Sequence, residues 1–139
     1  MTDTDTRQAT CSCGQLQLRL TGDPELVSSC HCLACQRRTG AVFASNAFFR
    51  QSQIVSTQGE RRAFRRQAES GTWMTSQFCP NCGSTVFWEN ERQADLVSVA
   101  VGAFADPHFP APIRTVWTTT KHEWLAFPAD IPQHRKGPA

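Results

Sequence analysis

The sequence has little excess charge and no long hydrophobic run, and each shortage excludes a class of protein. Its 14 Lys and Arg against 12 Asp and Glu give a formal net charge of +2. That value falls well short of the basic excess typical of nucleic-acid-binding domains. The longest nearly apolar run, residues 96–104, is too short to cross a bilayer. We therefore expect no nucleic-acid partner and no membrane span.

A signal peptide is also missing from the sequence as given. The first ten residues, MTDTDTRQAT, contain no apolar core of the kind that secretory signals need. We therefore expect a cytoplasmic, reducing environment. A chain of 139 residues is long enough for one domain and too short for two ordinary ones. The expected organisation is a flexible N-terminus over 1–10, one domain over 11–127 and a mobile, proline-rich tail over 128–139.

Short strand-like segments follow one another along the chain. Residues 15–20 alternate polar and apolar side chains with the period of a half-buried strand. Residues 63–67 and 72–78 predict a hairpin around the turn sequence AESG. Residues 115–120 are β-branched and aromatic, which favours another strand. The only helical candidate is a short segment at 33–38. The pattern predicts an all-β fold of small sheets with little helix.

Seven cysteines stand out in a chain of this length. Their odd number and the expected reducing compartment favour metal binding over disulfides. They fall into three clusters: CSC at 11–13, CHCLAC at 30–35 and CPNCG at 79–83. One partition leaves every cluster unbroken. It gives a four-sulfur group of Cys11, Cys13, Cys79 and Cys82, and a three-sulfur group of Cys30, Cys32 and Cys35.

The four-sulfur group is typical of a structural zinc site. Two residues between Cys79 and Cys82 allow both sulfurs to reach one ion. Pro80 restricts the turn, and Gly83 can adopt the positive φ that follows it. Such a site would join the N-terminal part of the chain to its middle, so that metal binding contributes to folding.

The three-sulfur group allows three interpretations. A catalytic zinc keeps one coordination position for water or substrate, and three thiolates leave such a position. A distant His108, His122 or His134, or a carboxylate, could instead close a second structural site. The cysteines could also act in redox chemistry without metal. His31 is a poor fourth ligand because it lies between two of the cysteines.

The three motifs together, CSCG, CHCLACQRRTG and FCPNCGS, resemble those of the glutathione-dependent formaldehyde-activating enzyme family, which includes the domain of centromere protein V. The similarity extends from about Cys11 to Trp124. It implies a β-tent of antiparallel sheets pinned by zinc. It also implies two zinc ions per chain, a structural one in the four-sulfur group and a catalytic-type one at Cys30, Cys32 and Cys35.

The resemblance further implies a carbon–sulfur lyase of the S-(hydroxymethyl)glutathione synthase type. Its partners would be a small thiol such as glutathione and a small aldehyde such as formaldehyde, joined or separated at the three-cysteine zinc. Arg37 and Arg38 follow this site and are candidates to bind a glutathione carboxylate. Both could equally be solvated loop residues. His31 is a further candidate for substrate binding.

One position departs from the family pattern, and two other functions remain open. Thr115 stands where many members carry a histidine, which would alter substrate preference if that histidine holds the substrate. The main alternative function is a non-catalytic zinc module that binds a macromolecular partner. A redox protein resembling methionine sulfoxide reductase B ranks last, because no cysteine follows Cys82. The sequence is compatible with a homodimer.

Overall fold

The computed structural model describes residues 5–137 and contains two β-sheets and one short α-helix. The smaller sheet has the strand order β1-β2-β5 and the larger one the order β10-β3-β4-β9-β8-β7-β6. The first contains β1 (Thr6–Thr10), β2 (Gln17–Thr21) and β5 (Ile54–Gln58). The second contains β3 (Leu26–Cys30), β4 (Ala44–Arg50), β6 (Arg62–Gln67), β7 (Trp73–Phe78), β8 (Thr85–Asn90), β9 (Leu96–Ala100) and β10 (Arg114–Val116).

The helical part is small. Helix α1 spans Leu33–Thr39, and the 3₁₀ turns are η2 (Gln51–Gln53), η3 (Glu91–Gln93), η4 (Val101–Phe104) and η5 (Thr118–Thr120). The predicted mainly-β class is therefore confirmed, as is the hairpin formed by β6 and β7, which pairs Arg62 with Phe78 and Gln67 with Trp73. Every strand pair is antiparallel except β10 with β3, which is parallel.

The hydrophobic core lies where the small sheet packs on one face of the large one. Leu18 and Leu20 of β2 are fully buried, as a period of two predicts for alternate positions of a strand. Alternation in the large sheet divides its residues in the same way. Val27, Phe49 and Val99 join the core, whereas their neighbours Ser28, Phe48 and Ser98 line a cavity on the other face. One sheet thus separates the core from the cavity.

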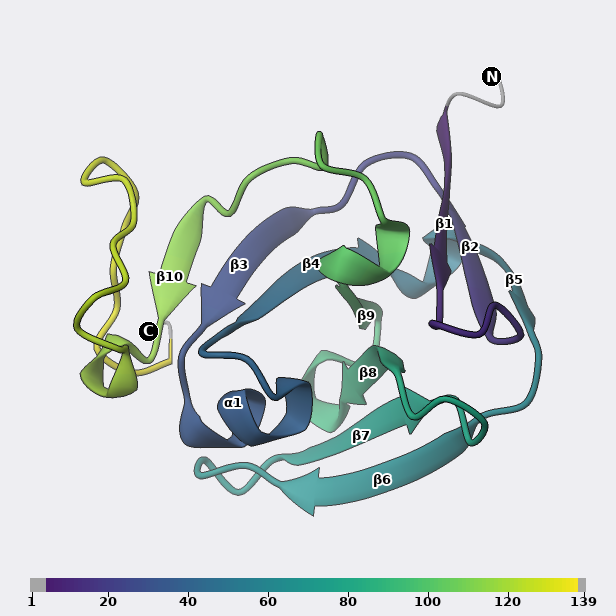
Figure 1. Ribbon diagram of the computed structural model, residues 1–139, viewed down its shortest axis with the longest axis horizontal. Helices are drawn as coiled ribbons and strands as arrows, with labels where there is room; N and C mark the ends of the chain where they lie inside the picture. Colours follow the sequence, from purple (N-terminus) through teal and green to yellow (C-terminus); the bar gives the residue numbers. More distant parts are fainter. Residues whose placement is uncertain (1–4, 138–139) are drawn as a thin grey trace.

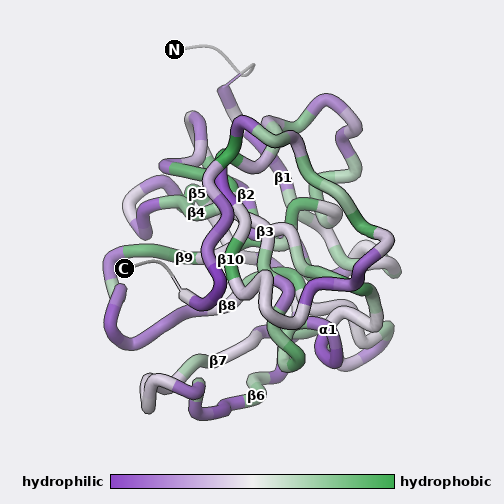
Figure 2. The backbone as a smooth tube through the Cα atoms, turned by 90° about the vertical axis from the view of Figure 1, so that its left-hand side faces the viewer, coloured by the Kyte–Doolittle hydropathy of each residue, from purple (hydrophilic) through white to green (hydrophobic). Residues whose placement is uncertain are grey.

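The views in Figures 1 and 2 show where the elements lie. Both place β1 and β2 at one end of the molecule and the β6–β7 hairpin at the opposite end. Helix α1 follows β3 and lies on the side of the molecule nearer this hairpin (Figure 1). The chain after β10 returns beside that strand (Figure 1).

Within the described residues, both segments that were expected to be flexible form backbone hydrogen bonds with the domain. Thr6–Thr10, expected to be part of a flexible N-terminus, forms β1 and pairs with Gln17–Thr21 along its length. Residues 1–4 and 138–139 lie outside the described part. The segment expected as a mobile tail hydrogen-bonds to β10: Thr115 N–H donates to Pro132 O at 3.0 Å, and His134 N–H donates to Thr115 O at 2.9 Å. Proline lacks an N–H but keeps its carbonyl acceptor, so it can cover a strand edge.

Candidate metal centres and substrate cavity

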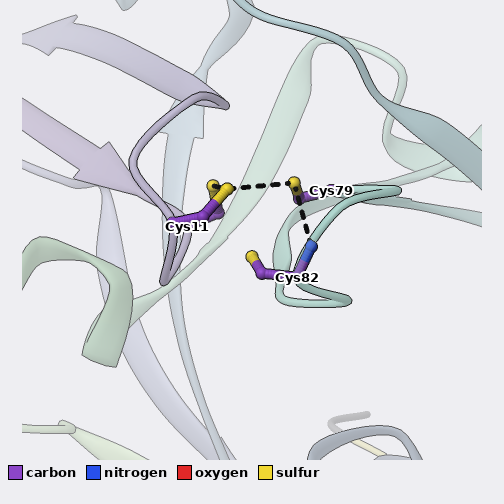
Figure 3. Close-up of side chains that lie close together, drawn as sticks. Cys11, Cys79 and Cys82 are labelled. Atoms are coloured by element: carbon purple, nitrogen blue, oxygen red, sulfur yellow. Dashed lines mark hydrogen bonds between the residues drawn. The ribbon is translucent and has the colours of Figure 1, made fainter.

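The four-sulfur group assembles as its spacing predicted. Cys11 and Cys13 lie on the turn between β1 and β2, and Cys79 and Cys82 on the turn between β7 and β8. Figure 3 shows Cys11 facing Cys79 and Cys82 across the gap between these two turns. Cys13 Sγ lies 3.7 Å from both Cys11 Sγ and Cys79 Sγ. A zinc–sulfur bond of 2.3 Å in a tetrahedron requires sulfurs about 3.8 Å apart, so these residues fit zinc.

Backbone and side-chain contacts support negative charge on these sulfurs. Leu16 N–H donates to Cys11 Sγ at 3.2 Å, and Asn81 N–H donates to Cys79 Sγ at 3.3 Å. Gln15 Nε2 also donates to Cys79 Sγ, at 2.9 Å. Contacts with the side chain and backbone of Ser84 lower the pKa of Cys82 to about 5. Hydrogen bonds to thiolates favour the charged form, which is the form that binds metal.

The three-sulfur group is formed by the end of one strand and the start of the helix that follows. Cys30 is the last residue of β3, Cys32 is the N-cap of α1, and Cys35 lies in its first turn. Cys32 Sγ accepts a hydrogen bond from the Cys35 N–H at 3.3 Å, which places the two cysteines on the same side of the start of α1. All three sulfurs lie within 4.8 Å of one another. Gly40, with φ of 68°, ends the helix in the left-handed conformation that glycine tolerates.

The electrostatics of this group favour a bound cation. Hydrogen bonds from Cys30 and Cys35 lower the pKa of the Cys32 thiol well below its usual range. The same contact with Cys32 raises the pKa of Cys30, and burial adds to the increase. Without a cation, one sulfur can hold the negative charge only while its neighbours stay protonated. Zinc would stabilise all three thiolates together.

No fourth ligand joins the three sulfurs within residues 5–137. The group that comes together consists of Cys30, Cys32 and Cys35 alone. His122, one of the histidines considered as a fourth ligand, instead places its Nε2 3.1 Å from Gln36 Oε1. All three cysteines line one cavity of about 860 Å³. The described residues therefore supply three candidate metal ligands that face one cavity.

The cavity combines apolar walls with an excess of positive charge. Its large apolar lining residues are Leu33, Phe48, Met74, Trp88, Val116 and Trp117. Its charged lining residues are Arg66, Arg92, Arg114, Lys136 and Glu69. Four cations and one carboxylate suit a ligand that has a net negative charge and some apolar surface.

The residues predicted to bind substrate lie elsewhere. Arg37 is exposed, and the Arg38 guanidinium stacks 3.9 Å from the ring of Trp88; neither lines the cavity. Arg38 thus contacts the cavity wall at Trp88 without forming part of the lining. His31 is fully buried, and its Nε2 lies 2.7 Å from Thr115 Oγ1.

Thr115, the departure from the family pattern, faces away from the cavity. It is fully buried and contacts His31, whereas its neighbours Arg114 and Val116 line the cavity. His31, which lies between Cys30 and Cys32 in the sequence, therefore packs behind the three-cysteine group, against the rings of Phe43 and Phe127. Thr115 therefore does not reach a ligand bound in the cavity.

Three arginines that line the cavity were not predicted from the sequence. Arg66 lies on β6, Arg92 on the η3 turn and Arg114 on β10, so three separate segments supply them. Proximity to the CHCLAC motif could not identify them. No pattern in the sequence marks these three positions, because only the arrangement of the elements brings them to one cavity.

Comparison with known proteins agrees with this geometry. The profile described as glutathione-dependent formaldehyde-activating enzyme matches residues 6–120, and the chain belongs to this family. The crystal structure of a Rhodobacter sphaeroides protein, a Northeast Structural Genomics target, aligns with a TM-score of 0.52 and 23% sequence identity. The alignment covers 72% of this chain and 91% of that one, and it supports the fold. No curated protein matches. Within residues 5–137, no helix has the length and apolar character needed to cross a membrane.

Proposed function

We propose that this protein is a zinc-dependent carbon–sulfur lyase that joins a small thiol to a small aldehyde, or separates them, with glutathione and formaldehyde as the leading pair. One observation carries the proposal. Three cysteine sulfurs line a positively charged cavity, and no fourth protein ligand closes the group among the described residues. A structural zinc site would instead have four protein ligands.

The reaction requires a thiolate, a carbonyl carbon and a proton. The thiolate sulfur forms a bond to the carbonyl carbon, the carbon–oxygen π bond breaks, and the oxygen takes a proton from solvent. The product is a hemithioacetal, an S-hydroxyalkyl thioether, and the reverse steps release the aldehyde and the thiol. A zinc ion held by three thiolates would offer a position for the thiol and lower its pKa.

The chain's own residues would bind and orient the reactants. Cys30, Cys32 and Cys35 hold the reacting end of the cavity, because their positions are set by β3 and α1. The rings of Trp88 and Trp117 line the cavity and would give a bound thiol apolar surroundings. The cationic lining attracts the two carboxylates of glutathione, which raises the local concentration of that thiol.

Two measurements test the proposal. Elemental analysis should give about two zinc ions per chain, because both sulfur groups have suitable ligands. Exchange spectroscopy with ¹³C-formaldehyde and glutathione should show faster formation and breakdown of the adduct with the zinc-loaded protein. Cys32→Ser should lose this effect and keep the fold, because serine can also cap α1.

A zinc content near two without any acceleration, for every thiol and aldehyde tested, would refute the enzyme proposal. That outcome would favour the alternative, a non-catalytic zinc module with a macromolecular partner. All seven cysteines are free of disulfides in the structure. A protein that loads one zinc ion or none and forms disulfides in air would favour redox chemistry at Cys30, Cys32 and Cys35.

A further inference from the structure

Three polar residues form a row across the floor of the cavity, beside the three-cysteine group. Arg114 of β10 pairs with Ser28 of β3, and Ser28 pairs with Asn46 of β4. All three side chains line the cavity, as does Cys30, two positions further along β3. The pleat of the sheet therefore places this row and Cys30 on the same face.

Two members of the row lack the partners that buried polar groups normally have. The half-buried Arg114 donates from Nε to Ser28 Oγ at 3.3 Å, and no carboxylate pairs with its guanidinium among residues 5–137. Asn46 is only 8% exposed, and its Oδ1 is buried without a hydrogen-bond partner in the described part of the chain. A cation without a counter-ion and an amide oxygen without a partner, on either side of Ser28 in one cavity, are typical of a site that awaits a ligand.

The spacing selects the kind of ligand. Ser28 and Cys30 are two residues apart on one strand, which separates their Cα atoms by about 6.6 Å. In a cysteinyl-glycine unit, six bonds join the sulfur to the carboxylate carbon, which spans about 7 Å when extended. The same unit carries a peptide N–H next to its carboxylate. A sulfur at the three-cysteine group would thus leave the carboxylate and the N–H near the polar row.

We propose that Arg114, Ser28 and Asn46 form a subsite for the last peptide group and the C-terminal carboxylate of a peptide thiol. Arg114 binds the carboxylate through its guanidinium, Ser28 positions that guanidinium through Nε, and the Asn46 side chain hydrogen-bonds the adjacent peptide group. This inference rests on the proposed function and deepens it, because it selects peptide thiols over simple ones. Arg114 and Asn46 would be specificity-determining residues.

Calorimetry on the zinc-loaded, full-length protein tests the subsite without relying on turnover. The ligands are glutathione, glutathione with its glycine carboxylate converted to an amide, S-methylglutathione and 2-mercaptoethanol. Wild type should bind glutathione about 10- to 100-fold more tightly than the amide form, the range expected for one charge-assisted pair. S-methylglutathione, whose sulfur cannot become a thiolate, should lose affinity in Arg114→Gln by the same factor as glutathione.

Arg114→Gln should remove the preference for the carboxylate and leave the affinity for 2-mercaptoethanol unchanged. Asn46→Leu should weaken glutathione binding by about 3- to 10-fold, as for one neutral hydrogen bond. Arg19→Gln, an exposed residue on β2 outside the cavity, is the charge-matched control and should bind like wild type. Arg114→Lys keeps the positive charge but loses the planar guanidinium that can bind a carboxylate through two hydrogen bonds. An intermediate loss of glutathione affinity in this variant supports the subsite even if the Gln variant folds poorly.

The outcomes separate the two proposals. If wild type binds thiols but does not distinguish glutathione from its amide form, or if Arg114→Gln and Arg114→Lys bind as wild type does, the subsite is refuted and the proposed function stands. If the zinc-loaded protein binds none of the thiols, including 2-mercaptoethanol at millimolar concentration, the proposed function is refuted and the subsite with it.

Discussion

The two sulfur groups should differ in what their loss does to stability, and Cys82→Ser compared with Cys32→Ser measures this difference. A metal at the four-sulfur group joins segments far apart in sequence, since Cys13 and Cys79 are separated by 66 residues. The entropy of closing a loop of that length corresponds to about 4 kcal/mol at 25 °C. The three-sulfur group spans only residues 30–35. The ratio of the two loop lengths makes the first cross-link the stronger by about 2 kcal/mol.

Both variants should be compared as zinc-loaded proteins by thermal melting and by guanidinium unfolding. Cys82→Ser should lower the melting temperature by about 10 to 15 °C, given about 4 kcal/mol and the unfolding entropy of a chain of this size. Cys32→Ser should lower it clearly less, because serine can retain the N-cap of α1. Thiol binding should show the reverse order, with Cys32→Ser the more affected. Equal melting temperatures, or a larger loss in Cys32→Ser, would refute the assignment of structural and open groups.

Three further predictions concern other parts of the structure. Gly59→Ala should sharply lower the melting temperature, because a Cβ would lie 1.9 Å from Gln15 O and φ is +96°; Gly14→Ala, also at positive φ but with nothing within 4 Å, should cost less. Thr115→Val should reduce the free energy of unfolding by about 1 to 3 kcal/mol, because buried His31 loses its hydrogen-bond partner. Thr115→Ser keeps the hydroxyl and should restore much of this stability. A Val variant as stable as wild type would contradict the prediction. Acidification should release zinc, measured with a chromogenic chelator, since protons compete for thiolate ligands; zinc retained far below the range in which the cysteines protonate would contradict thiolate coordination.

The metal groups could be predicted from sequence because their geometry is mostly local. In CPNCG and CHCLAC, two residues between cysteines suffice to place two sulfurs beside one ion, whatever the rest of the chain does. The pairing of Cys11 and Cys13 with Cys79 and Cys82 is long-range, and it could be predicted only because one partition kept every cluster intact. The structure brings together the same two groups.

The charged lining of the cavity could not be predicted from nearness in sequence. Arg37 and Arg38 follow the motif, but Arg37 is exposed and Arg38 stacks on Trp88, and neither lines the cavity. Arg114 comes into the cavity through the parallel pairing of β10 with β3, a contact over 86 residues. Non-local pairing of this kind leaves no periodic signal in a single sequence.

The strands at the ends of the chain show the same limit. Residues 6–10 contain mostly polar side chains, so they gave no hydrophobic alternation, yet β1 forms because β2 offers it a partner and Ala9 enters the core. The proline-rich tail looked unsuited to pairing. Its carbonyls nevertheless cover the edge of β10, where only acceptors and occasional N–H groups are needed.

The central claim is that a substrate thiol completes the three-cysteine zinc site. Zinc X-ray absorption of the fully loaded protein, before and after addition of glutathione, tests it most directly. With four sulfurs in one group and three in the other, the mean should be about 3.5 sulfurs per zinc and should rise to about 4 when the thiol binds. A mean that starts at 4, or that does not change at saturating glutathione, would contradict the account.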